Sequence, residues 1–199
     1  MKSEINTGII ILAAGSSSRL GQPKQLLEYN GKTLLEISIE AAQNSLAQTF
    51  ILVLGANAGL ISEDIRHLSI DQVINENWKN GMASSMQKGL KHLIENNSPD
   101  QVILMLSDQP FVSSRILNSL IDKKSNTVSE IVACSYNGTF GVPVLFTKKY
   151  FPALLALSGN EGAKKLVMAH QDDLGIVDFP QGAIDIDTMD DYLRLKNSI

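Results

Sequence analysis

Short apolar runs alternate along this chain with segments in which apolar residues recur every three or four positions. The runs at residues 9–12, 50–54 and 101–106 are too short for independent helices, and none contains a charged residue. Between them, residues 34–42 and the segment that begins at Met82 have the spacing of amphipathic helices. Strands that alternate with helices are typical of βαβ units. We therefore expect an α/β, Rossmann-like fold with a mostly parallel central sheet flanked by helices.

The second half of the chain continues this alternation. We expect further strands at residues 71–74, 130–135 and 140–146. We expect further helices at residues 58–67 and 148–157. Pro143 lies inside one of these strands, and it predicts a strand at the sheet edge because proline cannot donate a ladder hydrogen bond. Asp185 and Asp187 alternate with isoleucines, which predicts a short strand with both carboxylates on one face. Thr188 and Asp191 then have the spacing of a capping box at the start of a closing helix.

Composition places the chain among ordinary globular proteins and excludes several other classes. We expect one domain, residues 1–199, because this length suits a single core. The net charge is −4 and Lys and Arg form no block, so binding to nucleic acid through a basic face is not expected. No apolar stretch has the length of a membrane span and the N-terminal residues lack the apolar core of a secretion signal. The expected location is the cytoplasm.

The first apolar run leads into a stretch of small residues and then two cations. Small side chains let a backbone approach a ligand closely, and free N–H groups beside fixed positive charge suit a polyphosphate. Arg19 and Lys24 supply that charge here. An alternative interpretation is a plain connector with two solvated surface charges, and local composition alone leaves both open.

The order of residues in this stretch resolves the ambiguity by resemblance. LAAGxSxRxGxxK, residues 12–24, resembles the signature of nucleotidyltransferases that attach a nucleotide to molybdopterin or related phosphate-bearing acceptors. It is most similar to the molybdenum cofactor cytidylyltransferase branch, because the guanylyltransferase branch usually has Gly where this chain has Ala14. The resemblance implies a nucleotide-diphospho-sugar transferase (GT-A-like) architecture. It also implies a set of nucleotide-binding residues: Leu12, Ala13, Ala14, Gly15, Ser16, Ser17, Ser18, Arg19 and Lys24.

A second segment, residues 75–90, resembles the family pattern NxxWxxGMxSSxxxGL. Gly81 precedes the expected helix, and Ser84 and Ser85 fall in its first turn, where free N–H groups favour an anion or a base carbonyl. Ordinary capping, with Trp78 as a core anchor, is the alternative interpretation. The resemblance assigns Ser85 to the cytosine and includes Gly81 and Ser84 in the nucleotide site.

Two acidic motifs are candidates for a metal site. Asp108 directly follows a buried strand, at the sheet edge where ligands bind in open α/β folds, and carboxylate oxygen suits Mg²⁺. The motif LxDQPxV around it resembles the family's metal-binding signature. The later DIDTxxD motif implies that Asp187 is the second ligand, with Asp185 as second choice.

Three residues are expected on the acceptor side. Gln109 follows the metal-binding aspartate, and Pro143 belongs to a GxP motif that resembles the family's. Lys164 stands where cofactor-linked members usually have Arg, and Asn160 stands where they have Asp. Because Arg and Lys differ as phosphate ligands, these departures bear on the identity of the acceptor more than on the reaction.

The resemblance implies a Mg²⁺-dependent transfer of CMP from CTP to the terminal phosphate of molybdopterin or molybdenum cofactor, with release of pyrophosphate. Arg19 and Lys24 would be the catalytic residues by neutralising charge on the phosphates. A molybdoenzyme is a candidate recipient of the product. The alternatives are a related transferase that uses GTP or another phosphate-bearing acceptor, and a non-catalytic nucleotide-binding or molybdenum-cofactor-binding chaperone. The intact acidic motifs favour an enzyme.

Overall fold

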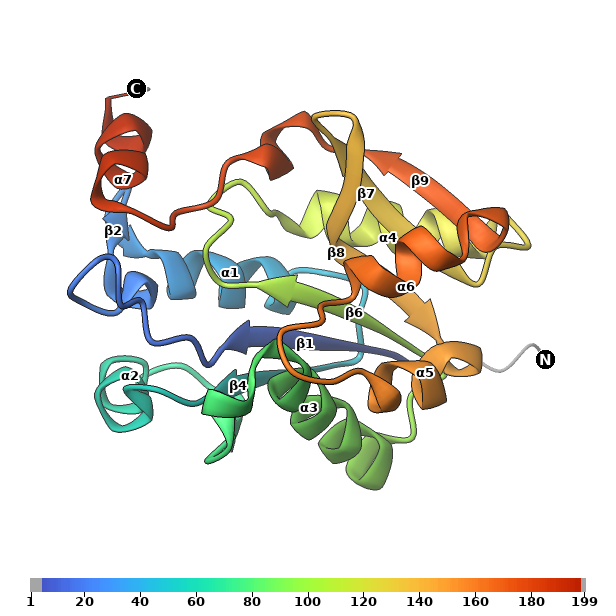
Figure 1. Ribbon diagram of the computed structural model, residues 1–199, viewed down its shortest axis with the longest axis horizontal. Helices are drawn as coiled ribbons and strands as arrows, with labels where there is room; N and C mark the ends of the chain where they lie inside the picture. The colour runs from blue at the N-terminus through green and yellow to red at the C-terminus, as the bar shows by residue number, and fades with distance from the viewer. Residues whose placement is uncertain (1–4, 198–199) are drawn as a thin grey trace.

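The computed structural model describes residues 5–197 and is built around one seven-stranded sheet (Figure 1). The strands lie in the order β5-β4-β1-β6-β8-β7-β9. Their bounds are β1 (Thr7–Ala13), β4 (Thr49–Leu54), β5 (Asp71–Ile74), β6 (Gln101–Leu106), β7 (Ile131–Tyr136), β8 (Thr139–Thr147) and β9 (Leu174–Asp178). All neighbouring pairs are parallel except the two that involve β8. The predicted mostly parallel sheet is confirmed.

Helices cover both faces of this sheet, as predicted. They are α1 (Leu34–Gln43), α2 (Ala58–Asp64), α3 (Met82–Asn97), α4 (Ser114–Ser125), α5 (Phe151–Ala156) and α6 (Lys164–Ala169), whereas α7 (Met189–Lys196) lies beside the sheet. One apolar core lies between the sheet and α3, α5 and α6, and a second lies between the sheet and α1, α2 and α4 (Figure 1). In β1, Ile10 contributes to the first core and Ile9 and Ile11 to the second. Each of these fully buried side chains stabilises the fold by about 1.5–3 kcal/mol.

The expectation of an edge strand at Pro143 was wrong. β8 lies between β6 and β7, well inside the sheet. The pairing of β7 with β8 shifts register between Ala133 and Cys134, so Val142 and Pro143 lie in a bulge. The Val142–Pro143 peptide is cis. A bulge residue needs no ladder hydrogen bond, and this is how an inner strand accommodates proline.

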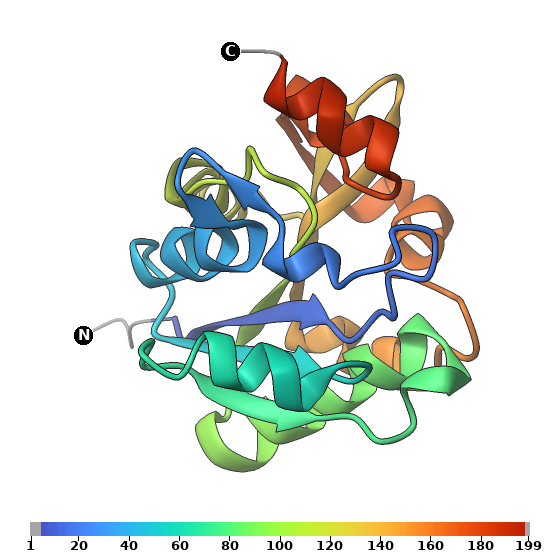
Figure 2. The ribbon, with the colours of Figure 1, turned by 90° about the vertical axis from the view of Figure 1, so that its left-hand side faces the viewer.

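A smaller layer stands beside the main sheet. The short strands β2 (Glu28–Tyr29) and β3 (Lys32–Thr33) pair with each other and contact α7, where the Tyr192 hydroxyl donates to the Glu28 carbonyl at 2.8 Å. Figure 2 shows α7, in red, above this blue ribbon. A third apolar cluster holds the two together through Leu20, Leu27, Leu34, Ile186 and Leu195. The C-terminal part of the chain is thereby fixed next to the loop that follows β1.

The predicted capping box at Thr188 is present, and Thr33 and Glu36 form a second one at the start of α1. The Thr33 hydroxyl accepts from the Glu36 amide at 3.1 Å, and the Thr188 hydroxyl accepts from the Asp191 amide at 3.2 Å. Other element bounds differ from expectation: α2 ends at Asp64, and residues 148–157 form a 3-10 turn (Lys148–Tyr150) before α5. The predicted strand at residues 184–187 was wrong: the segment is an irregular connection, held to the loop after β6 by the hydrogen bond from the Ile186 amide to the Asp108 carbonyl at 3.0 Å. Among the described residues, no helix combines the length and apolar character that crossing a bilayer requires.

Candidate functional site

The chain reverses its direction of travel across the sheet at β1. From β1 it moves through α1 to β4 and then to β5, whereas β6 returns to the opposite side of β1. Leu12 and Leu106 pair in the parallel register, so the loops that leave β1 and β6 start side by side. Open α/β sheets bind ligands at such a switch point, beyond the carboxyl ends of the strands. The motifs LAAGxSxRxGxxK and LxDQPxV lie in these two loops.

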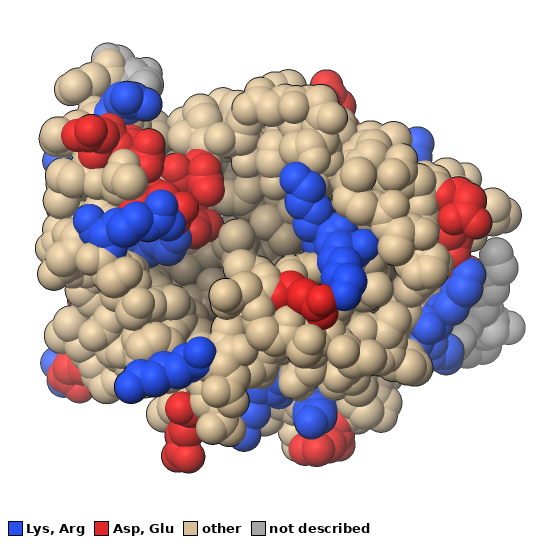
Figure 3. Space-filling view, viewed as in Figure 1, with Lys and Arg blue, Asp and Glu red and all other residues tan. Residues whose placement is uncertain are grey.

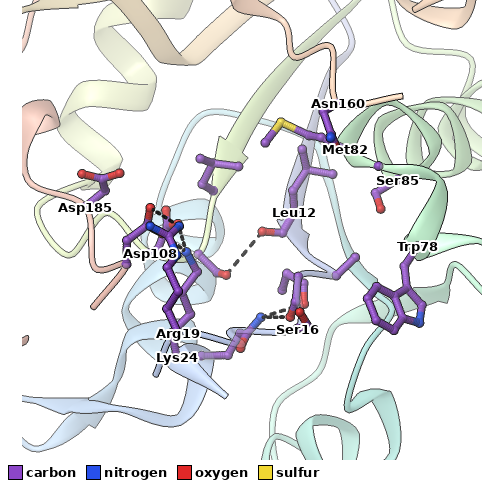
Figure 4. A pocket seen from close by; sticks show the side chains of 18 of the residues that line it. Leu12, Ser16, Arg19, Lys24, Trp78, Met82, Ser85, Asp108, Asn160 and Asp185 are labelled. Atoms are coloured by element: carbon purple, nitrogen blue, oxygen red, sulfur yellow. Dashed lines mark hydrogen bonds and ion pairs between the residues drawn. The ribbon is translucent and has the colours of Figure 1, made fainter. Parts of the chain in front are cut away.

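A cavity of about 540 Å³ opens at this point. Figure 3 shows a hollow in this face, with acidic and basic atoms gathered on its left-hand side. Figure 4 shows Asp108, Arg19 and Lys24 at one end of the cavity and Trp78 and Ser85 at the other. Of the predicted site residues, the following line it: Leu12, Ala13, Ala14, Gly15, Ser16, Arg19, Lys24, Gly81, Ser85, Asp108, Asp185 and Asp187.

The loop after β1 leaves its backbone donors open. Within residues 5–197, the amides of Ser16, Ser17 and Ser18 donate to no protein acceptor. Gln25, which is buried, holds the loop in this shape because its side-chain amide donates to the Ala13 carbonyl at 2.9 Å. Ser17 has a positive φ of 52°, and its hydroxyl accepts from the Lys24 amide at 3.0 Å. The loop therefore presents several N–H groups to an anion, as expected for a triphosphate cradle.

The two predicted metal ligands meet at one cation. Lys24 Nζ donates to Asp108 Oδ2 at 2.5 Å and to Asp187 Oδ1 at 2.9 Å. Arg19 donates to the other oxygen of Asp187 at 2.8 Å. Residues far apart in the sequence thus form one charged cluster at the end of the cavity.

Burial and charge shift the protonation equilibria in this cluster. The hydrogen bond from Lys24 holds the pKa of Asp187 below its ordinary value. Burial lowers the pKa of Lys24, but the attraction of Asp108 and the hydrogen bonds outweigh it, so the net shift is upward. Burial, then repulsion by Asp108 and Asp187, raises the pKa of Asp185. The raised pKa of Asp185 indicates that the cluster favours additional positive charge.

These residues fit a divalent cation that shares its coordination with a substrate. Asp108 Oδ1 is buried and has no hydrogen-bond partner among the described residues. No three His, Cys, Asp or Glu side chains within residues 5–197 form a complete metal cage. Mg²⁺ is commonly held by one or two carboxylates together with phosphate oxygens, and a pair formed by Asp108 and Asp187 matches that pattern.

The opposite end of the cavity suits a planar base. Ser85 is buried, and its hydroxyl accepts from the side-chain amide of Asn75 at 3.0 Å. That contact leaves the Ser85 proton available to a base carbonyl. Ser84 does not line the cavity; its hydroxyl donates to the Gly81 carbonyl at 2.8 Å and accepts from the side-chain amide of Asn75 at 2.8 Å. Sequence reasoning assigned no role to Asn75, although it opens the NxxW motif, or to Gln25, because the partners of a side-chain amide become known only from the fold.

A second cavity, of about 240 Å³, adjoins the first. The two cavities share Leu12, Met82, Leu106 and Asn160 in their walls. Lys164 lines the second cavity but not the first.

The other residues expected on the acceptor side, and two of the loop serines, lie elsewhere. Gln109 is buried and donates to the Gly182 carbonyl at 2.8 Å, which makes it an anchor for the segment before Asp185. Pro143 lies in the β8 bulge, and neither Gln109 nor Pro143 lines a cavity. Ser17 and Ser18 do not line either cavity, so Ser16 is the predicted loop serine that does.

Comparison with known proteins agrees with this geometry. The MobA-like NTP transferase domain family matches residues 9–174. Purine catabolism protein PucB of Bacillus subtilis is 27% identical over 96% of both chains, and nicotine blue oxidoreductase of Paenarthrobacter nicotinovorans is 28% identical over 94% of both. The crystal structure of Rv0371c from Mycobacterium tuberculosis is 31% identical, with a TM-score of 0.84 over 97% of this chain and 98% of that one. A further structure of Rv0371c is a complex with manganese.

The likeness extends along nearly the whole chain and confirms the GT-A-like fold class. It also confirms the resemblance drawn from the sequence motifs. The chain belongs to the MobA-like NTP transferase family and is a nucleotidyltransferase of the molybdopterin nucleotidyltransferase type.

Proposed function

We propose that this protein transfers CMP from CTP to the terminal phosphate of molybdopterin or molybdenum cofactor in a Mg²⁺-dependent reaction that releases pyrophosphate. The observation that carries the proposal is the meeting of Asp108, Asp187 and Lys24 beside a loop with open amides. A manganese complex of the relative Rv0371c supports a divalent cation in this family. The cytoplasm is the proposed location, with a molybdoenzyme as recipient of the product.

The chain's own residues would act mainly through charge placement. The Ser16 amide at the cavity wall would bind an outer phosphate of CTP, and Arg19 and Lys24 would neutralise charge that develops on the leaving pyrophosphate. Asp108 and Asp187 would hold Mg²⁺, which supplies further neutralisation of phosphate charge. No protein nucleophile is needed, because the acceptor phosphate oxygen attacks the α-phosphorus directly.

Packing at the base end supports a pyrimidine. A Cβ atom at Gly55 would lie 2.7 Å from Trp78 Cβ and 2.8 Å from the Ala14 carbonyl oxygen, so these three segments are already in close contact. Ala14 and Trp78 both border the cavity. The Ala14 methyl group therefore has little room to withdraw from the cavity wall, and the choice of cytosine rests on this methyl group at a position where the guanylyltransferase branch usually has Gly.

The second cavity is the proposed site of the acceptor. Its walls are mainly apolar, with Met86, Phe140 and Val142 among them, and Lys164 supplies a positive charge. Such a site suits a flat organic body that carries phosphate. Its shared wall with the nucleotide cavity would bring the acceptor phosphate toward CTP.

The test is pyrophosphate release measured with CTP or GTP, each with and without molybdopterin, in Mg²⁺ buffer and after addition of EDTA. Release should require CTP, molybdopterin and Mg²⁺ together. Asp108→Asn and Lys24→Ala should each lower kcat by about 10²–10³, the usual cost of losing a preorganised electrostatic contact. Asp100→Asn is the matched control, since Asp100 pairs with Lys148 away from both cavities. Near-normal release by the Asp108 variant, or release that needs no acceptor, would contradict the proposal.

A further inference from the structure

In this structure the ammonium group of Lys24 lies between the carboxylates of Asp108 and Asp187, the two proposed metal ligands. Nζ lies 2.5 Å from Asp108 Oδ2 and 2.9 Å from Asp187 Oδ1. The side chains of Lys24 and Asp108 are only 16% and 9% exposed, so this is a largely dehydrated contact. Such a pair is stable only while each charge has its partner.

Lys24 has two possible partners within one cavity. Its backbone is fixed, because its amide donates to Ser17 and its residue opens the 3-10 turn Lys24–Leu26. Its flexible four-carbon side chain can still rotate, and Ser16, whose amide has no protein acceptor within residues 5–197, lines the same cavity. One ammonium group cannot neutralise both the aspartate pair and a bound triphosphate at full strength.

We propose that Lys24 occupies the divalent-cation position in the nucleotide-free protein and is exchanged for the ion when the triphosphate binds. The inference rests on the proposed function in taking a nucleoside triphosphate and a divalent cation as ligands. Charge balance drives the exchange. The triphosphate attracts Nζ away from Asp108 and Asp187, and the vacated carboxylates then need the charge of a divalent ion, with phosphate oxygens completing its coordination.

The exchange makes the metal site conditional on substrate. Without nucleotide, an ion must displace Lys24 from two hydrogen bonds, so affinity for the metal alone is low. With nucleotide, the same carboxylates are free. Nucleotide and metal therefore bind cooperatively.

The deciding measurement is a titration of the nucleotide-free protein with Mn²⁺. The electron paramagnetic resonance signal of free Mn²⁺ reports how much of the ion is bound. Lys24→Met keeps the side-chain length but removes the charge, and it should bind Mn²⁺ about tenfold or more tightly than wild type, since two close carboxylates lose their counter-ion. Adding Asp108→Asn to Lys24→Met should abolish that gain. Equal affinities in wild type and Lys24→Met would overturn the proposal.

Lys79→Met is the matched control for net charge. Lys79 also borders the cavity, but it lies over the Trp78 ring, 5.6 Å from its centroid, and pairs with neither aspartate. Its removal should change Mn²⁺ affinity by less than about threefold, because the charge is not at the ion's position. If Lys79→Met tightens binding as much as Lys24→Met does, general electrostatics account for the effect and the exchange is wrong.

Two further readouts keep the proposal testable if Lys24→Met is unstable. Mn²⁺ should raise the Tm of Lys24→Met more than that of wild type, because a ligand stabilises the form that binds it better. In wild-type crystals soaked in Mn²⁺ alone, Nζ should remain between Asp108 and Asp187, and Mn²⁺ should replace it only when a non-hydrolysable CTP analogue is added. Mn²⁺ seated there without nucleotide would overturn the proposal. These experiments omit the acceptor, and the Mn²⁺ titrations omit CTP, so they can succeed even if the proposed reaction is wrong.

Discussion

Gly81 joins the nucleotide end of the cavity to the loop beside the second cavity. It precedes α3 with φ 97° and ψ 177°, a region of backbone conformation that is essentially confined to glycine. A Cβ atom there would lie 2.2 Å from the Gly159 carbonyl oxygen and 2.4 Å from its carbon. Both contacts are with backbone, so no side-chain rotation can relieve them.

Gly81→Ala should therefore destabilise the protein substantially. The forbidden backbone conformation costs about 1–3 kcal/mol. The Gly159 carbonyl must also move away, which breaks its hydrogen bond from the Ala83 amide, worth about 0.5–1.5 kcal/mol. We expect the free energy of unfolding to fall by about 2–4 kcal/mol, a large share of the stability of a typical domain.

Urea denaturation gives the free energy directly, and Gly59→Ala is the matched control. Gly59 lies in α2, where an added Cβ meets no heavy atom within 4 Å and φ is not positive, so alanine should stabilise by about 0.4–1 kcal/mol. The two Gly→Ala changes thus have opposite expected signs. If the free energy of unfolding of Gly81→Ala lies within about 0.5 kcal/mol of the wild-type value, the reasoning is refuted, because ordinary surface substitutions change it by that much.

Three further outcomes are expected. Thr188→Ala should lower the free energy of unfolding by about 1 kcal/mol at pH 7, measured in urea, because it removes the cap of α7. The hydrogen bond from Thr188 holds the pKa of Asp191 below its ordinary 3.8. The resulting stabilisation is present above pH 3.8 and is lost as the pH falls through the folded-state pKa. Urea denaturation across this range should therefore show that the free energy of unfolding falls less with acid in Thr188→Ala than in wild type. Ser85→Ala should raise KM for CTP about three- to tenfold with little change in kcat, as expected for one lost neutral hydrogen bond in steady-state kinetics.

The sequence was sufficient to predict those features that depend only on residues close together along the chain. The capping boxes at Thr33 and Thr188 need only residues three positions apart, and both formed. The run at residues 9–12 became β1 because continuous apolar character is buried on both faces. β9 had no such signal: it contains Gly175, and Ile176 on this edge strand is 45% exposed.

Interpretation failed where a residue's role depends on a distant partner. Pro143 predicted an edge strand, but a register shift against β7 placed it in a bulge of an inner strand. Asp185 and Asp187 alternate like strand residues, yet within residues 5–197 no strand forms a ladder with this segment. They reach the cavity because Gln109 holds Gly182 and because Ile186 joins the third apolar cluster.

The sequence by itself determined the alternation of strands and helices and the loop of small residues after β1. It also determined that Asp108 follows a buried strand and that Asp187 precedes the last helix. These follow from side-chain size, polarity and local hydrogen bonding, which short stretches of chain express independently. Only the tertiary structure decided that Lys24 bridges Asp108 and Asp187, that Asn75 orients Ser85, and that Gln25 shapes the loop. Charge pairing and buried hydrogen bonds act across space, and their partners become neighbours only when the sheet order is set.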